Sequence, residues 1–178
     1  PVKQLLESQE LYYEMRPARR EDNPPVKLRN NAFTRMYEVL TKMYGMPSFT
    51  DFDPTPIVAP FFSLFFAFCM GDAGYGLALI ALGLFLKKKL GKDMAGMMNL
   101  VITLGIFTTV FGALLGTFFG MNLLQSDLPQ QIKQFIIAGN MELFGSTYDK
   151  QMILALGIGV VHISIAMTVK AINSTVFY

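Results

Sequence analysis

The sequence is poor in charge and in the side chains that carry most metal and redox chemistry. Only 16% of its 178 residues are charged, whereas a soluble domain usually carries about a quarter. Cys69 is the only cysteine, which excludes an internal disulfide and a multi-cysteine metal site. His162 is the only histidine. Since no second ligating side chain stands at a suitable spacing, we expect no metal ion and no cofactor.

The motifs of several enzyme classes are also absent. The sequence has no phosphate-binding loop, no nucleophile elbow and no pair of catalytic acids. The stretch "GDAGYG" is not a nucleotide loop, because it follows an apolar run without a strand-turn-helix context or a lysine. We therefore expect a non-catalytic protein without a nucleic-acid partner.

Long runs with almost no charge are what the sequence does contain. Hydrophobic residues make up 52% of the chain, and its mean hydropathy is +0.40. Asp72 is the only charge in Ile57–Leu86, none lies between Asp93 and Asp127, and Gln151–Val169 is uncharged. A transmembrane helix needs about 20 apolar residues. The sequence thus predicts an integral, multi-pass protein surrounded by membrane lipid.

The first run, Ile57–Leu86, is predicted to be a hairpin rather than one helix. A straight helix of about thirty residues would be about 45 Å long, whereas the hydrocarbon core is about 30 Å thick. Cytoplasmic loops collect Lys and Arg. Eight such residues precede Ile57 and four lie in Lys87–Lys92. Both ends of the run therefore belong on the same side, which requires two crossings.

The hairpin turn is predicted at "MGDAGYG", with Gly71, Gly74, Tyr75 and Gly76 forming the reversal. Asp72 would be the N-cap of the second arm. Each arm would have about fifteen residues and a length of about 22 Å, which is short of a full span. We expect the tip to be buried in protein or in a watery vestibule, because irregular backbone is not tolerated against lipid.

The complete prediction is an all-α fold: a polytopic membrane helical bundle of about four transmembrane helices in two hairpins, preceded by a short helical cytoplasmic segment. Residues 1–50 would be the end of a cytoplasmic N-terminal domain with a linker, and residues 51–178 the first half of a transmembrane domain. The four helices are expected at about 57–71, 73–88, 94–122 and 151–172. An external loop at about 123–150 would hold a short interfacial helix around Pro129–Ala138. The N-terminus would be cytoplasmic.

Two amphipathic helices are predicted in the first 50 residues. One is "KQLLESQELYYEM", which has apolar residues at near-helical spacing. The other is "NNAFTRMYEVLTKMYG", with Asn31 as its N-cap and Gly45 as its end. The apolar residues on one face of this second helix are Phe33, Met36, Tyr37, Leu40 and Tyr44.

Two titratable residues inside the apolar runs are candidates for function. Asp72 would be a capping carboxylate satisfied by backbone amides, part of an ion path, or the partner of a cation on a helix outside this chain. His162 would be a hydrogen-bonded packing residue or part of a proton relay.

Glycines are spaced for close helix packing. "GALLGTFFG" places Gly112, Gly116 and Gly120 four residues apart, and Gly105 lies on the same helical face. This small-xxx-small pattern lets helices approach closely. Packing within one bundle is the favoured use, and a contact between subunits is the alternative.

Five pieces of sequence in order resemble a known family: "PPVKLRN", "MYGMP", "DPTP", "APFFSLFF" and "GDAGYG". The chain resembles the membrane subunit a, or I, of V/A-type rotary ATPases from about Pro24 onward, and "GALLGTFFG" is similar to the family's third membrane helix. The resemblance implies a cytoplasmic arm that joins peripheral stalks and an eight-helix membrane domain beside a proteolipid ring. It implies translocation of protons or sodium ions.

The resemblance also implies an essential arginine in late helices, whereas the last arginine here is Arg35. We therefore expect a fragment that holds the end of the arm and the scaffold half of the membrane domain. The alternative is an unrelated secondary ion-coupled transporter, with a broken-helix site at Gly71–Gly76.

Overall fold

The computed structural model describes residues 6–9, 26–48, 51–91, 94–125, 129–137, 139–143 and 145–176, and the single residues 12, 14, 16, 22 and 24. The helices are α2 (Ala32–Tyr44), α3 (Thr55–Met70), α4 (Ala73–Lys89), α5 (Ala95–Leu115), α6 (Gln130–Lys133) and α7 (Lys150–Val176), with a 3-10 turn η2 (Leu123–Gln125). The strands are β1 (Thr117–Phe118), β2 (Met121–Asn122), β3 (Asn140–Leu143) and β4 (Ser146–Asp149). The fold is therefore mostly helical, but it is not purely α.

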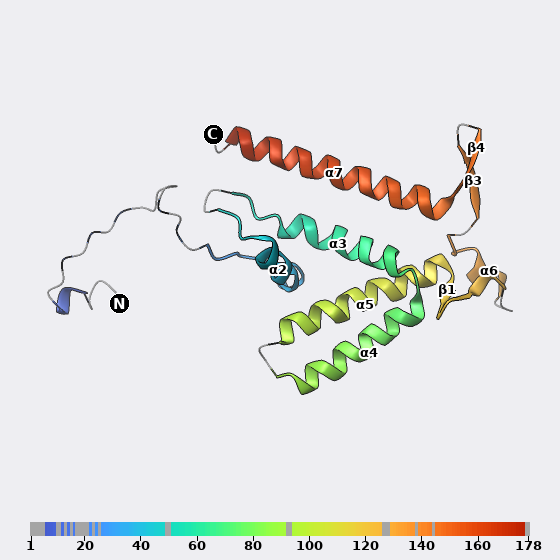
Figure 1. The fold of residues 1–178 in the computed structure, drawn as a ribbon, viewed down its shortest axis with the longest axis horizontal. Coiled ribbons are helices and arrows are strands. Elements are labelled where there is room, and N and C mark those ends of the chain that lie inside the picture. The colour runs from blue at the N-terminus through green and yellow to red at the C-terminus, as the bar shows by residue number, and fades with distance from the viewer. Residues whose placement is uncertain are drawn as a thin grey trace.

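Four helices, α3, α4, α5 and α7, run back and forth across the same layer (Figure 1). The α3–α4 turn and the four short strands gather at one end of this layer, and the α4–α5 connection and the end of α7 lie at the other. Helix α2 is seen almost end-on in Figure 1, so it crosses the others beside α3 and α5. Successive helices reverse direction in this layer, and the most extensive packing is that of α4 on α5.

Two of these helices are long and apolar enough to span a membrane. They are Ala95–Leu115 in α5, with a hydropathy of 2.0, and Lys150–Thr175 in α7, with a hydropathy of 2.2. Helix α3 is apolar but has only 16 residues, which corresponds to about 24 Å. The observed lengths agree with the expectation that the arms of the first hairpin are short.

The helix predicted at 94–122 ends earlier, at Leu115. Gly116 has a φ of 76° and caps the helix, and Gly120 has the same φ in the turn between β1 and β2. Left-handed backbone of this kind cannot continue a right-handed helix. Gly116 and Gly120 therefore do not extend the packing face of the helix, and that prediction is wrong.

The turn between α3 and α4 is also shorter than the predicted four-residue reversal. Gly71 ends α3 in a left-handed conformation with a φ of 56°, and Asp72 is extended and begins α4. Gly74, Tyr75 and Gly76 already lie in the first turns of α4. The reversal therefore needs only Gly71 and Asp72, because the aspartate can cap the following helix at once.

Glycines on both α4 and α5 allow these two helices to touch. A Cβ added at Gly105 would lie 2.9 Å from the carbonyl oxygen of Gly76, and one at Gly112 would lie 2.8 Å from Ala73 Cα. On the α4 side, a Cβ at Gly83 would lie 2.6 Å from Ile102 Cγ1. Backbone thus meets backbone along this pair, as close packing of membrane helices requires.

Helix α2 has the predicted ends. The Asn31 side chain accepts a hydrogen bond from the backbone N–H of Thr34 at 2.8 Å, and Gly45, with a φ of 123°, follows the last turn. Four of the predicted apolar residues, Phe33, Met36, Tyr37 and Leu40, pack into the core. Tyr44, by contrast, is 89% exposed. Of the helix predicted in "KQLLESQELYYEM", only a short helical piece at residues 6–8 is described, and most of the segment lies outside the described residues.

The core lies where α2, α3 and α5 meet. Its buried residues are Tyr37, Ala59, Leu100 and Leu104, with Phe62 and Phe66 packed against them. Tyr37 meets Phe62 edge to face at a ring distance of 6.3 Å. The amphipathic helix is thereby part of the same packed unit as the apolar helices.

The connection between α5 and α7 is less helical than predicted. The expected interfacial helix is reduced to one turn, α6, and Ala138 lies outside the described residues. The antiparallel pair β3–β4 takes up the remainder, with Asn140 opposite Asp149. Alternating polar residues in strands this short give too weak a periodicity to be recognised from sequence.

We predict that Gly112→Ala will destabilise the subunit, because the new methyl group meets the backbone of Ala73. Overpacking of this kind costs about 1–3 kcal/mol. Gly96→Ala is the matched control on the same helix, since a Cβ there has nothing within 4 Å. It should be neutral or stabilise by up to about 1 kcal/mol. Thermal unfolding of the two purified variants measures the difference, and equal stability would contradict the backbone contact.

Candidate functional site

The strongest candidate site is the Asp72 carboxylate at the tip of the α3–α4 hairpin. Asp72 is only 5% exposed, and the adjoining Ala73 is equally buried. The turn between β1 and β2 covers the tip, and the Thr117 hydroxyl donates a hydrogen bond to the carbonyl of Gly71. The irregular backbone at this turn is therefore enclosed by protein.

Four backbone N–H groups donate hydrogen bonds to this carboxylate. Oδ1 accepts from Gly74 at 2.8 Å, from Tyr75 at 3.2 Å and from Phe119 at 2.8 Å. Oδ2 accepts from Gly120 at 2.7 Å. Two of the donors come from the start of α4 and two from the β1–β2 turn, so the acid joins segments that are more than forty residues apart.

The β1–β2 turn is shaped to present its two amides to the acid. Phe119 and Gly120 both have left-handed backbone, with φ values of 47° and 76°. Successive amides in such a turn point to one side and form a concavity that binds anions. The Phe119 ring fills the space over Gly74, where a Cβ would lie 2.5 Å from Cδ2 of the ring. It also meets Tyr75 edge to face at 5.6 Å.

This geometry favours the capping hypothesis for Asp72. A carboxylate that accepts several amide hydrogen bonds at a helix N-terminus is stable as an anion without a counter-ion. Among the described residues, no cationic side chain forms an ion pair with it. The oxygens that an ion path or an external salt bridge would use are already engaged by the protein's own backbone.

The same contacts disfavour a transporter site at Gly71–Gly76. Such a site needs free backbone groups and space for a substrate at the break. Here Phe119 occupies the space beside Gly74, and a Cβ at Gly76 would lie 2.8 Å from Thr109 Cα. The break between α3 and α4 is filled by the rest of the chain.

His162 lies on α7 against the aromatic side chains of α3. Its ring stacks on Phe61 at 4.5 Å with an interplanar angle of 23°, and it meets Phe65 at 5.8 Å. It forms no hydrogen bond within the part of the chain that the structure describes. His162 is thus held by ring stacking, not by the hydrogen bond that we expected, and no neighbouring titratable group continues a proton relay within this part.

A second set of polar contacts, not predicted from the sequence, ties α2 to the first half of α3. The Tyr37 hydroxyl bonds Ser63 Oγ, and Thr41 Oγ1 lies 2.8 Å from Thr55 Oγ1. Tyr37, Ser63 and Thr55 are all 0% exposed. The signal for these pairs is the presence of Ser63 inside the first apolar run and of Thr55 directly before it.

The direction of the Tyr37 hydrogen bond follows from its partner. Ser63 Oγ already donates its single hydrogen to the carbonyl of Ala59 at 2.8 Å. Tyr37 must therefore be the donor. Burial raises the pKa of Tyr37, and the bond to Ser63 lowers it by less. The phenol accordingly keeps its proton at neutral pH.

A third contact fixes the segment before α2 to the segment before α3. The Asn30 side-chain amide donates to Asp53 Oδ2 at 2.9 Å and to Glu38 Oε1 at 3.0 Å. Asp53 Oδ1 also accepts from the backbone N–H of Thr55 at 2.9 Å. No cluster of three or more metal-ligating side chains occurs among the residues described.

A comparison with protein families identifies the group to which this sequence is related. The profile of the V-type ATPase 116kDa subunit family matches residues 3–153, which covers α2 to α5 and the start of α7. The chain belongs to this family.

Individual relatives agree with the assignment. An A-type ATP synthase subunit I from Methanothermobacter thermautotrophicus is 30% identical over 159 residues, which cover 84% of this chain and 23% of the relative. One from Pyrococcus abyssi is 40% identical over 114 residues, covering 61% and 17%. A V-type ATP synthase subunit I from Chlamydia pneumoniae is 30% identical over 127 residues, covering 68% and 19%. The matched segment is thus less than a quarter of each relative.

Membership of the V-type ATPase 116kDa subunit family confirms the resemblance drawn from the five sequence motifs. It places the chain in a membrane subunit of rotary ATPases that is a non-catalytic component. The two long apolar helices are consistent with that membrane location.

We predict that Tyr37→Phe will loosen the docking of α2. The change removes the hydrogen bond that the Tyr37 hydroxyl donates to buried Ser63, which keeps only its bond to Ala59. The loss of one such hydrogen bond costs about 0.5–1.5 kcal/mol. Tyr44→Phe in the same helix is the matched control, because Tyr44 is 89% exposed. Limited proteolysis between α2 and α3, together with thermal unfolding, should show an effect for Tyr37→Phe only. Equal behaviour of the two variants would show that the buried hydroxyl does not hold α2.

Proposed function

We propose that this chain is the scaffold part of the stator membrane subunit of a V/A-type rotary ATPase, which supports proton or sodium translocation beside a proteolipid ring. The observation that carries the proposal is the Asp72 carboxylate, since the only acid of the first apolar run is bound by four backbone amides. An acid held in this way joins helices and does not exchange an ion. The partners of the complete subunit would be the proteolipid ring and the peripheral stalks.

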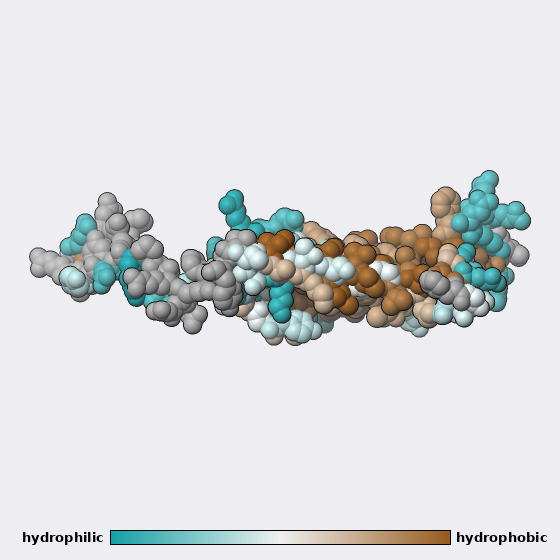
Figure 2. Space-filling model, turned by 90° about the horizontal axis from the view of Figure 1, so that it is seen from above, coloured by the Kyte–Doolittle hydropathy of each residue, from teal (hydrophilic) through white to brown (hydrophobic). Residues whose placement is uncertain are grey.

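We propose a membrane topology of four crossings in two hairpins, with a cytoplasmic N-terminus. Figure 2, the view onto the α7 side, shows an apolar band across the middle of the molecule between hydrophilic ends. The α4–α5 connection lies at the same end of the helices as α2 (Figure 1). The basic residues Lys87–Lys89 at the end of α4 and those before α3 are then on one side, as the positive-inside rule requires.

The role of α2 in this proposal is to join the cytoplasmic arm to the membrane helices. It is tied to α3 by Tyr37–Ser63 and Thr41–Thr55, and to α5 by packing of Phe33 on Phe107 at a ring distance of 6.4 Å. A stator must resist the torque of a rotating ring. Buried polar pairs between packed helices give a stiff connection for that purpose, since breaking any pair leaves an unsatisfied group.

We assign the translocation of protons or sodium ions to another part of the subunit. The sequence has no arginine after Arg35, so it holds no arginine within the proposed membrane helices. The described helices would position the remaining part of the membrane domain beside the ring.

We predict that Asp72→Asn in the complete complex will lower assembly, whereas ion pumping per assembled complex will stay near the wild-type value. The asparagine carbonyl can keep the bonds at Oδ1, but its amide group cannot accept from the N–H of Gly120. The N–H of Gly120 is then left without an acceptor, which should lower the free energy of unfolding by about 1–3 kcal/mol. The measurements are copurification of the proteolipid and catalytic subunits with the tagged subunit, and ATP-driven ion uptake by reconstituted vesicles.

Asp149→Asn is the matched control for this experiment. Asp149 caps α7 through one exposed hydrogen bond, from the backbone N–H of Gln151 at 2.8 Å. Its replacement should leave assembly and pumping unchanged. Normal assembly of Asp72→Asn with abolished pumping would falsify the capping role and make Asp72 part of an ion path.

A further inference from the structure

The segment that leads into α2, residues 26–31, forms no helix or strand, yet one of its sides is packed against the molecule. Val26 and Leu28 are half-buried and Asn30 is buried, whereas the two basic residues between them are exposed. Side chains alternate in this way when an extended chain lies along a surface. We call this segment the strap, and Asn30 is its last inward-facing residue.

Asn30 places its side-chain amide between two carboxylates. Its Nδ2 group donates to Glu38 Oε1 on α2 at 3.0 Å, and to Asp53 Oδ2, just before α3, at 2.9 Å. Both hydrogens of the amide are thereby used. The Asn30 Oδ1 atom lies 3.3 Å from Thr34 Oγ1 on α2. One side chain, which is 9% exposed, therefore joins the strap to α2 and to the start of α3.

The two carboxylates have no charged partner among the residues that the structure describes, since neither forms an ion pair there. Asp53 Oδ1 accepts from the backbone N–H of Thr55 at 2.9 Å and from its hydroxyl at 2.6 Å. The same acid therefore binds the first residue of α3 and the strap. Because two carboxylates repel each other when no donor lies between them, the position of Asn30 requires a group with two N–H hydrogens.

The neighbouring Asn31 has a different role. Its side chain is exposed and accepts a hydrogen bond from the backbone N–H of Thr34 as the N-cap of α2. Aspartate is as favourable as asparagine at an N-cap. A negative charge is therefore acceptable at position 31, whereas at position 30 it would face two further carboxylates.

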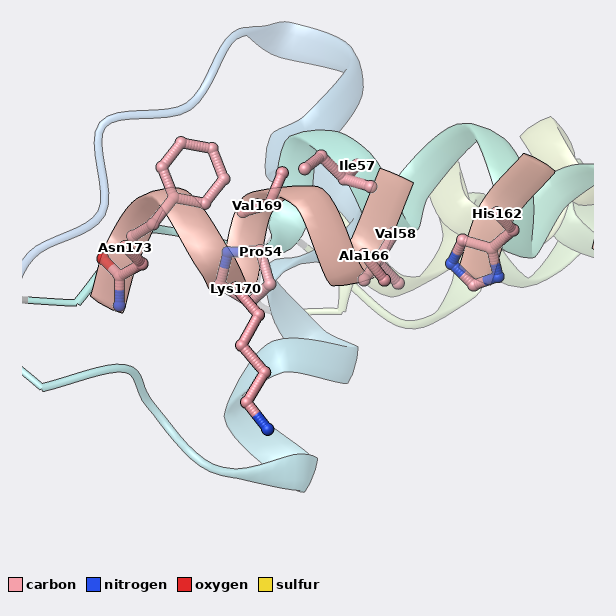
Figure 3. A pocket seen from close by; sticks show the side chains of 9 residues that line it. Pro54, Ile57, Val58, His162, Ala166, Val169, Lys170 and Asn173 are labelled. Atoms are coloured by element: carbon pink, nitrogen blue, oxygen red, sulfur yellow. The ribbon is translucent and has the colours of Figure 1, made fainter. Parts of the chain in front are cut away.

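The part of α3 that Asn30 holds also borders α7. Pro54, which directly follows Asp53, lines a groove of about 210 Å³ between these two helices, together with Ile57 and Val58 (Figure 3). Helix α2 packs on α3 as well. The start of α3 is thus the place where the strap, the amphipathic helix and the apolar helices meet.

We propose that Asn30 is the positioning residue of a rigid three-way joint, which fixes the direction in which the cytoplasmic arm leaves the membrane helices. The joint consists of Asn30, Glu38 and Asp53. The strap cannot turn about the start of α2 without breaking both of its amide hydrogen bonds. The proposal rests on the proposed stator function, because it assumes that the strap continues an arm whose direction matters.

The test measures the position of the strap in the complete complex in lipid vesicles. Spin labels are attached at Lys27→Cys on the strap and Lys88→Cys at the end of α4, both exposed positions, in a complex with Cys69→Ser and no other reactive cysteine. Asn30→Asp removes both donors and adds a third carboxylate. The population with a displaced label distance should rise by at least about tenfold, since one hydrogen bond to a charged group is worth roughly that factor.

Asn31→Asp is the matched control, because it adds the same charge one residue further on and keeps the N-cap. It should give the distance distribution of the parent complex. A reversal variant combines Asn30→Asp, Glu38→Gln and Asp53→Asn, so that two amides donate to one carboxylate. It should restore the parent distribution, and also assembly if Asn30→Asp alone lowers it.

The same distribution in Asn30→Asp as in Asn31→Asp would overturn the proposal. A displacement or an assembly defect that the reversal variant does not correct would also overturn it, because Asn30 would then act through general stability and not through these two bonds. Failure of the stator proposal would appear instead in the Asp72→Asn experiment, which leaves all three residues of the joint unchanged.

Discussion

A carboxylate buried at the tip of an apolar hairpin is the constraint on which the rest of this structure depends. Asp72 can be buried as an anion only if donors surround it, and a tight turn supplies just the two amides at the start of α4. The other two come from Phe119 and Gly120, which brings the end of α5 to the hairpin. The early end of α5 and the left-handed β1–β2 turn are consequences, because a helix continuing through Gly120 would keep these amides in its own hydrogen bonds.

The packing of α4 on α5 and the docking of α2 both keep the end of α5 close to the tip of the α3–α4 hairpin. Glycines at positions 76, 105 and 112 let the two helices approach until backbone meets backbone. On the other side of α5, the core of Tyr37, Leu100 and Leu104 needs an amphipathic helix to close it. Small residues thus set the distance between two apolar helices, and hydroxyl pairs fix the position of α2.

The sequence specified those elements whose signals are local, and it failed where the structure depends on distant contacts. Asn31 and Gly45 marked the ends of α2, and the glycine-flanked Asp72 marked the hairpin tip. The spacing of Gly112, Gly116 and Gly120 indicated one helical face, but it could not show which glycines would adopt a positive φ. The amides of Phe119 and Gly120 left no trace in sequence either, because any residue carries a backbone donor and only its position in space makes it a ligand.

The chain has two parts that differ in how far their side chains are held by contacts within the chain. In α2 to α5, the buried polar atoms of Tyr37, Ser63 and Asp72 find partners within the chain. Helix α7 is different: the Gln151 amide holds one end to the carbonyls of Leu115 and Ile137, and His162 stacks on α3 near its middle. Its remaining surface is apolar and uncovered. The first part is held together by its own buried contacts, whereas α7 leaves an apolar surface that the described chain does not cover.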